Sequence, residues 1–205
     1  MENSDDPLGS VRKRDQSLSD GIPSPCPASG ARYIWIGVLI VLVMIEGLLM
    51  GADAGLWGSA NWRPMGYHYG GFWTGLLRDW EPLYTAQPVV MFVSYPFLHT
   101  DWQHVLGNGL ALGWLGMQLG ERISPRRFAL LLGLSSLGGA VGFALLSQSS
   151  RPMVGASGIV MGLIAAWIAL EAREMAEDGK PLWRILGAIC AYVLRSGCID
   201  LSCAA

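Results

Sequence analysis

The sequence predicts an all-α integral membrane protein, a bundle of membrane-spanning helices, on three observations. Hydrophobic residues make up 52% of the 205 residues and charged residues only 15%, whereas a soluble domain carries about 25% charge. Glycine (27) and tryptophan (9) are both abundant, as in closely packed membrane helices with aromatic anchors at the interface. Four apolar runs also have lengths near those that cross a bilayer.

The first element is a polar stretch, residues 1–32, rich in Ser, Pro, Asp and Gly. It is predicted to be a disordered tail because it has too few apolar side chains to bury. The first span is predicted over 33–50, with Glu46 near its far end, where a charge costs less than at mid-membrane. The alternative is a cleaved signal peptide, but the leader is too long and the apolar core exceeds the 7–15 residues of such peptides.

Three further spans are predicted over 104–119, 128–146 and 154–170. A fifth apolar run, 182–194, has thirteen residues, too few for the roughly 20 that a span needs. The prediction is therefore four full spans plus a partial fifth, forming a membrane domain over 33–194. The atypical C-terminal tail, 195–205, indicates a reading-frame change or a premature stop; the alternative is a genuine short protein.

The connection over 51–98 is unusually aromatic for a linker. Indole and phenol rings favour the headgroup level of a bilayer, so this connection is expected to lie partly in the membrane interface. The alternative is a compact extramembrane loop. Its aromatic residues are Trp57, Trp62, Tyr67, Tyr69, Phe72, Trp73, Trp80 and Tyr84.

Basic residues next to the spans predict the orientation. With the N-terminus inside, ten lysines and arginines lie in inner segments and only Arg63, Arg78 and Arg151 in outer ones. The positive-inside rule then predicts a cytoplasmic N-terminus in a multi-pass protein of the cell (inner) membrane. A net charge of −2 argues against nucleic acid as a partner. In this orientation the second and fourth spans both begin at the outer face.

The sequence HVLGN at the start of the second span places His104 and Asn108 at i, i+4, on one helix face. Two polar side chains on one face are expensive inside a bilayer unless they have a use. Mutual hydrogen bonding between helices is the structural explanation. The functional interpretation is a donor pair that stabilises an oxyanion.

The sequence GASG at the start of the fourth span places Ser157 at a helix N-terminus, where free N–H groups and the helix dipole favour negative charge. Gly155 and Gly158 leave room for a substrate backbone to come close. Gly158 and Gly162 also form a G-x-x-x-G that lets a neighbouring helix approach. Helix packing is the structural explanation for this motif, and a nucleophilic serine is the functional one.

A metal site is not expected. His99, Asp101 and His104 form no H-E-x-x-H motif and have no evident further ligand. We expect His99 to tie the end of the aromatic connection to the second span. The four cysteines show no C-x-x-C pair or metal-ligand spacing, so no metal and no cofactor is predicted.

In combination, FLHTDWQHVLGNGLALGWLG and, two spans later, GASGIVMG resemble the rhomboid family of intramembrane serine proteases. The resemblance covers about residues 33–194. It implies a polytopic helix bundle with a six-span core, an H-x-x-x-N motif on helix 2 and a G-x-S-G motif on helix 4. It also implies an aromatic interfacial loop between the first two spans.

The resemblance implies that Ser157 is the nucleophile that attacks a peptide carbonyl in a transmembrane substrate. It also implies that His104 and Asn108 supply the oxyanion hole, with the Ser157 N–H. Gly155 and Gly158 match the glycines around the nucleophile. His99 matches a supporting histidine.

The general base is missing from this pattern. In rhomboids it is a histidine on helix 6, but none of the three histidines here follows Ser157. Using His104 as the base would remove an oxyanion donor, and Lys180 is expected on the cytoplasmic side. Losing one triad member costs factors of about 10⁴ to 10⁶ in soluble serine proteases, so little proteolysis is expected from these 205 residues alone.

Two functions follow. The first is a rhomboid-type serine endopeptidase that cleaves transmembrane proteins near the outer face of the lipid bilayer, without metal or cofactor. The second is a catalytically inactive relative that binds transmembrane helices. A transporter or channel has little support, because Glu46 is the only acid clearly within a span and no inverted repeat is evident.

Overall fold

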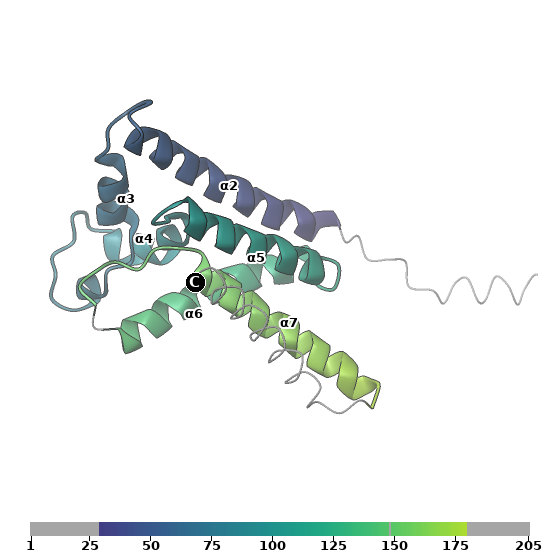
Figure 1. Ribbon diagram of the computed structural model, residues 1–205. Helices are drawn as coiled ribbons and strands as arrows, with labels where there is room; N and C mark the ends of the chain where they lie inside the picture. The colour runs from purple at the N-terminus through teal and green to yellow at the C-terminus, as the bar shows by residue number, and fades with distance from the viewer. Residues whose placement is uncertain (1–28, 148, 180–205) are drawn as a thin grey trace, which may run out of the picture.

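The computed structural model describes residues 29–147 and 149–179. These residues form helices and loops, with no strand pairing beyond one isolated bridge between Phe72 and Met153. Four long helices make up the bundle in Figure 1: α2 (Ser29–Asp53), α5 (Trp102–Gly120), α6 (Pro125–Leu146) and α7 (Ser157–Glu177). The predicted all-helical class is confirmed for this part of the chain.

By length and apolar composition, α2 and α6 qualify as membrane spans, over Gly30–Asp53 and Pro125–Leu146. The count of four full spans stays a prediction. Helix α2 starts four residues before the predicted span. Helix α7 begins three residues after the predicted start of the fourth span at Val154, because Gly155 has a φ of +116°, which a right-handed helix does not accommodate. The predicted partial fifth span over 182–194, Lys180, the C-terminal tail and most of the N-terminal tail lie outside the described residues.

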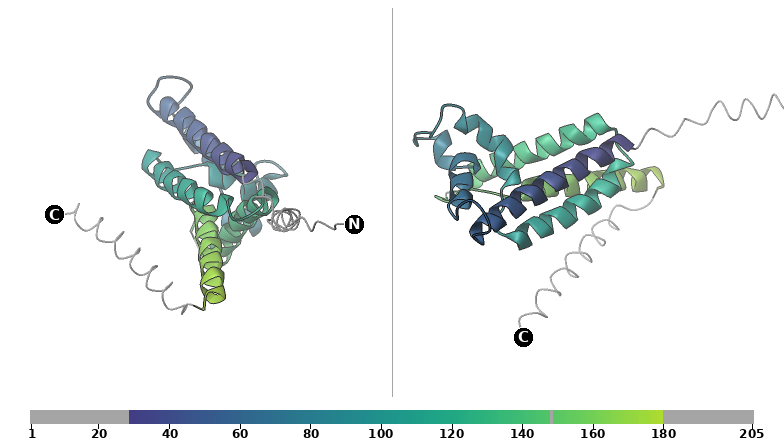
Figure 2. Two further views of the ribbon diagram at one scale, coloured as in Figure 1. Left: turned by 90° about the vertical axis from the view of Figure 1, so that its right-hand side faces the viewer. Right: turned by 90° about the horizontal axis from the view of Figure 1, so that it is seen from above.

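The long helices pack in neighbouring pairs. Helix α2 lies beside α5, α5 also contacts α7, and α7 lies beside α6 (Figures 1 and 2). Their shared core consists of fully or nearly fully buried apolar side chains, including Leu42, Leu112, Leu115, Phe128 and Leu163. Because successive long helices run in opposite directions, the end of α2 and the starts of α5 and α7 lie at the same end of the bundle, beside α3 and α4 (Figure 1).

The aromatic connection is a folded segment rather than an extended loop. It contains α3 (Trp62–Gly70), the 3-10 turn η1 (Thr74–Leu77), α4 (Gln87–Ser94) and the 3-10 turn η2 (Tyr95–Phe97). Phe72 is its centre: the ring is fully buried and makes edge-to-face contacts with Phe92, Tyr95 and Phe143 of α6. Trp57, Trp62 and Trp80 remain exposed. Their predicted place in the membrane interface stays a prediction.

One ion-pair network joins this segment to α2. The Arg63 guanidinium donates to both carboxylate oxygens of Glu46, at 3.1 and 2.9 Å, and to Asp53 Oδ2 at 2.6 Å. It also donates to the carbonyl oxygen of His99 at 2.7 Å, which accepts the Tyr67 hydroxyl at 2.6 Å as well. Glu46 is only 2% exposed, so its charge is compensated by this one arginine. The network holds α2, α3 and the start of α5 in one arrangement.

We expect Arg63→Met to lower the free energy of unfolding by about 3–5 kcal/mol, because it leaves the Glu46 carboxylate buried without its partner. The measurement is reversible unfolding in mixed micelles. Glu46→Gln combined with Arg63→Met should recover part of the loss. The matched control is Arg122→Met, which removes the more exposed pair with Glu171 and should cost about 1 kcal/mol or less. If Arg63→Met and Arg122→Met lowered the free energy of unfolding equally, Arg63 would not be the residue that compensates the buried Glu46 charge.

Helices α6 and α7 approach closely through small residues. A Cβ atom added to Gly158 would lie 3.3 Å from the Cα of Gly139 and 2.9 Å from the Tyr95 hydroxyl. One added to Gly162 would lie 2.0 Å from Ser135 Oγ. The close approach expected from the G-x-x-x-G spacing is therefore present, and its partner is α6.

Gly162→Ala should destabilise the bundle by about 1–3 kcal/mol, because the new methyl group must push α6 away. Thermal denaturation in detergent measures the effect. Gly138→Ala is the matched control on α6, since a Cβ at Gly138 meets nothing within 4 Å, and it should leave the melting temperature nearly unchanged. A milder effect at Gly162 than at Gly138 would show that the close contact does not exist.

Candidate active site

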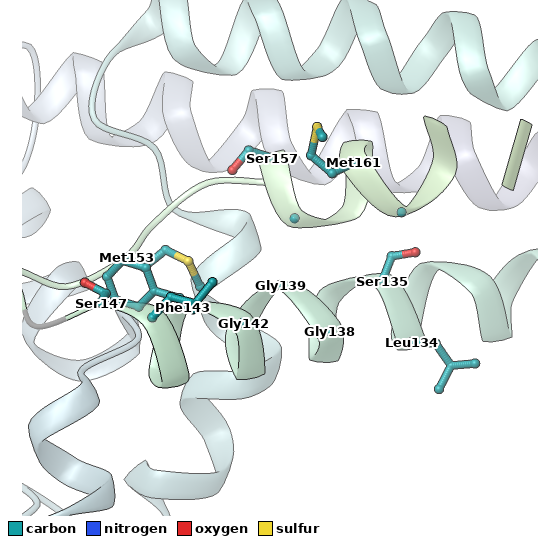
Figure 3. Close-up of a pocket in the computed structure, with 13 residues that line it drawn as sticks. Leu134, Ser135, Gly138, Gly139, Gly142, Phe143, Ser147, Met153, Ser157 and Met161 are labelled. Atoms are coloured by element: carbon teal, nitrogen blue, oxygen red, sulfur yellow. The ribbon is translucent and has the colours of Figure 1, made fainter. Parts of the chain in front are cut away.

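Ser157 is the first residue of α7, and its side chain is exposed. The first N–H groups of a helix have no acceptor within it, so those of Ser157 and the next residues are free. The Ser157 hydroxyl has no hydrogen-bond partner among the described residues. It lines a groove of about 960 Å³ between α6 and α7, together with Met153, Gly158 and Met161 (Figure 3). A substrate can therefore approach it.

The backbone just before the serine, residues 153–156, is fixed by four hydrogen bonds, and we name it the pre-serine segment. Met153 exchanges two bonds with Phe72, of 3.0 and 2.9 Å. The Gly155 N–H donates to the Tyr95 carbonyl at 3.0 Å. The Ala156 N–H donates to His99 Nε2 at 3.4 Å. The aromatic connection therefore sets the direction in which the chain enters α7.

His104 and Asn108 come together against this segment. A Cβ atom at Gly155 would lie 2.6 Å from His104 Cε1, 2.8 Å from His104 Nε2 and 3.6 Å from Asn108 Nδ2. Only glycine fits here, for reasons of space and of its positive φ. The structure thus places the two side chains of HVLGN directly beside GASG, as the sequence predicts. Their chemical roles stay predictions.

The Asn108 amide is a donor without an acceptor. The side chain is 8% exposed, and its Nδ2 has no hydrogen-bond partner. A buried unpaired donor is costly, by about 1–3 kcal/mol, and such groups are rare in folded proteins. This one lies beside the free N–H groups at the start of α7, where an oxygen with developing negative charge would satisfy it.

Thr100 and Asp101 orient His104. Asp101 caps α5, since its Oδ1 accepts the His104 N–H at 2.9 Å, and this bond lowers the pKa of the Asp101 carboxyl. Thr100 Oγ1 lies 3.2 Å from His104 Nδ1 and 2.9 Å from Asp101 Oδ2. Because the Thr100 hydroxyl donates its one hydrogen to Asp101 Oδ2, a neutral His104 ring donates from Nδ1 to Thr100 Oγ1 and keeps Nε2 as an acceptor. His104 Nε2 carries a hydrogen that it can donate to an oxyanion when the Thr100 hydroxyl turns to donate to His104 Nδ1 instead.

His99 is fully buried, and its ring packs edge-to-face on His104 with centroids 5.0 Å apart. Its Nε2 accepts the Ala156 N–H, so the ring must be neutral to do so. Burial, helped by the neighbouring His104, lowers the pKa of His99 to about 4, against smaller opposing effects from the Phe97 backbone and Asp101. His99 thus links the start of α5 to the pre-serine segment.

Stability should fall as the pH falls from about 6.5 to about 4, since the unfolded His99 binds a proton in this range and the folded one does not. Over this whole pH range, the free energy of unfolding should fall by about 3 kcal/mol. Unfolding free energies at several pH values measure it. His99→Gln, whose amide oxygen can still accept the Ala156 N–H, should show a flatter pH dependence. Parallel curves for the two proteins would exclude this role for His99.

The described residues contain no group of three or more His, Cys, Asp or Glu side chains that could hold a metal ion. Among the described residues, no basic side chain is hydrogen-bonded to the Ser157 hydroxyl. His68 is in α3, stacked on Trp73, while His99 and His104 are engaged as described.

Sequence reasoning missed Tyr95 and Thr100. Tyr95 is fully buried, its hydroxyl donates to the Ser136 carbonyl at 2.7 Å, and its carbonyl oxygen accepts from Gly155. Thr100 touches His104. Both precede HVLGN by a few residues in an aromatic stretch, and no spacing rule distinguishes them from their neighbours.

Parts of this chain are similar in sequence to known proteins. The family model described as the Rhomboid domain matches residues 86–202. The curated protein "RHOMBOID-like protein 5" of Arabidopsis thaliana is 35% identical over 78 residues, which are 38% of this chain and 25% of the relative. The chain therefore matches about a quarter of that relative's length. No solved structure matches it.

Proposed function

The chain belongs to the rhomboid family, and on this premise we propose that it carries the nucleophile and the oxyanion donors of a serine endopeptidase that cleaves transmembrane proteins near the outer membrane face. The rhomboid domain and the two apolar helices α2 and α6 make it an integral membrane protein. The observation that carries the proposal is the buried, unpaired Asn108 amide beside Gly155, next to an exposed serine at a helix N-terminus.

The proposed chemistry is addition of Ser157 Oγ to a substrate carbonyl carbon, with the carbonyl π electrons moving to its oxygen. The resulting oxyanion accepts hydrogen bonds from the Asn108 amide and the Ser157 N–H. It also accepts from His104 Nε2–H once the Thr100 hydroxyl turns from Asp101 to His104 Nδ1. The hydroxyl proton must leave to a base, and the amide nitrogen must gain a proton when the peptide bond breaks. None of the described residues makes a hydrogen bond from a basic group to the Ser157 hydroxyl. We therefore expect the 205 residues by themselves to cleave a peptide bond slowly.

A fluorophosphonate probe tests the proposal, because it reacts with an activated serine and leaves a stable adduct. In liposomes, the 205-residue chain should label slowly. Added imidazole should accelerate labelling in proportion to its free-base concentration, since it replaces the missing base. Ser157→Ala should abolish labelling, whereas Ser135→Ala, which removes another serine of the same groove, should preserve it. Labelling that persists in Ser157→Ala would refute the nucleophile.

Asn108→Ala should slow the imidazole-assisted labelling by about 10²–10³-fold, the usual cost of one oxyanion donor. Because the amide bonds to nothing in the structure, its loss should leave the melting temperature unchanged or slightly raised. A labelling rate equal to that of the original protein would show that Asn108 takes no part in the oxyanion hole.

The second candidate is an inactive family member that binds transmembrane helices. Its support is the lack of a base against Ser157 in the described residues, together with the groove lined by glycines of α6 and α7. If Ser157 stays unlabelled with imidazole while a fluorescent transmembrane peptide still binds in liposomes, this candidate replaces the enzyme.

A further inference from the structure

A second, smaller cavity of about 170 Å³ lies within the aromatic connection, and we propose that it binds a quaternary ammonium group. Ser157 does not line it, and the proposal is independent of the proposed function. Its lining includes His68, Trp73, Trp80, Glu81 and Gln87. It is smaller than the 300–1,000 Å³ of ordinary ligand pockets, so it fits one head group rather than a whole cofactor.

Three aromatic rings line this cavity, and two of them are held in place. His68 and Trp73 stack with centroids 5.7 Å apart, and Trp73 and Trp80 lie 5.8 Å apart at 45°. The Trp73 indole N–H donates to the Tyr67 carbonyl at 2.8 Å. Trp80 lies on Gly75, where an added Cβ would come within 2.2 Å of the ring. A cation is attracted to the π faces of such rings.

The Gln87 amide of the cavity is already hydrogen-bonded. Gln87 is 1% exposed, its Nε2 donates to the His68 carbonyl at 2.7 Å, and its Oε1 accepts from the Leu83 N–H at 2.8 Å. Apart from Glu81 and the His68 ring, the lining side chains offer no free acceptor for the three N–H groups of a primary ammonium. A quaternary ammonium has no N–H to satisfy, so its charge can be stabilised by the π faces alone.

The charge of the cavity also favours a cation. Glu81 lines it, and this carboxylate has no ion pair or hydrogen bond within the described part of the chain. No lysine or arginine is among the lining residues. An anion would be repelled both by Glu81 and by the negative faces of the rings. Two sources supply the same chemistry: the choline headgroup of a membrane lipid and free choline.

The experiment is NMR of the full 205-residue chain with ¹⁵N-labelled tryptophan, in micelles of a phosphatidylglycerol detergent that contains no choline. Choline chloride is titrated and the indole N–H signals are followed. The matched ligand is 3,3-dimethylbutan-1-ol, which has the shape of choline without the charge. Sodium chloride at equal concentration controls for ionic strength.

We expect choline to shift the Trp73 and Trp80 signals saturably, and the neutral alcohol to leave them nearly unchanged. Trp80→Leu should weaken choline binding about 5- to 30-fold, the range of a cation–π contact. Glu81→Gln should weaken it a few-fold, whereas Glu121→Gln, an exposed carboxylate outside the cavity, should not. Equal shifts by the alcohol, or no saturable shift by choline, would overturn the proposal.

Two further arms complete the test. Contacts between Trp80 protons and choline methyl protons in phosphatidylcholine nanodiscs would identify the lipid headgroup as the source. Their absence there, with binding of free choline retained, would identify the free ion. Ser157→Ala should bind choline unchanged, so failure of the proposed catalytic function and failure of this cavity are distinguishable.

Discussion

The turn at Gly155 is the constraint on which the candidate site depends. Its φ of +116° and the histidine ring 2.6 Å from where a Cβ would lie leave space for glycine alone. This turn lies at the end of the loop that joins α6 to α7, and α7 begins two residues later, at Ser157. It also brings the backbone against His104 and Asn108. The proposed nucleophile and the proposed oxyanion donors, which are some fifty residues apart, become neighbours through this one backbone conformation.

The aromatic connection holds that turn from the other side. Phe72 and Tyr95 of the connection, and His99 just after it, each bond the pre-serine segment. Arg63 and Tyr67 bond the His99 carbonyl. Through Arg63 the same network reaches the buried Glu46 in α2. A buried charge pair adds little net stability over a hydrophobic one, but it permits few alternative positions. We infer that Glu46 serves to place the connection correctly over the starts of α5 and α7.

Two cavities with different chemistry therefore lie toward the same end of the bundle. The groove at Ser157 is lined by glycines and apolar side chains and offers an exposed hydroxyl, which suits a peptide backbone in a dry environment. The cavity in the aromatic connection offers π faces and one carboxylate, which suits a positively charged head group. If both proposals hold, the connection that supports the site also binds a lipid headgroup or a small cation.

The sequence by itself determined the helical class, the approximate bounds of the long helices and the pairing of HVLGN with GASG. Apolar runs of span length and the i, i+4 and G-x-x-x-G spacings are local signals. They predict the helices correctly because a helix forms from hydrogen bonds between residues close in the sequence. Only the tertiary structure decided the fold of the aromatic connection, the partner of Glu46 and the importance of Tyr95 and Thr100. Those contacts join residues far apart in the chain, or depend on the direction of a single side chain. No local period encodes them, because they arise only when α2, α5 and α7 have packed together.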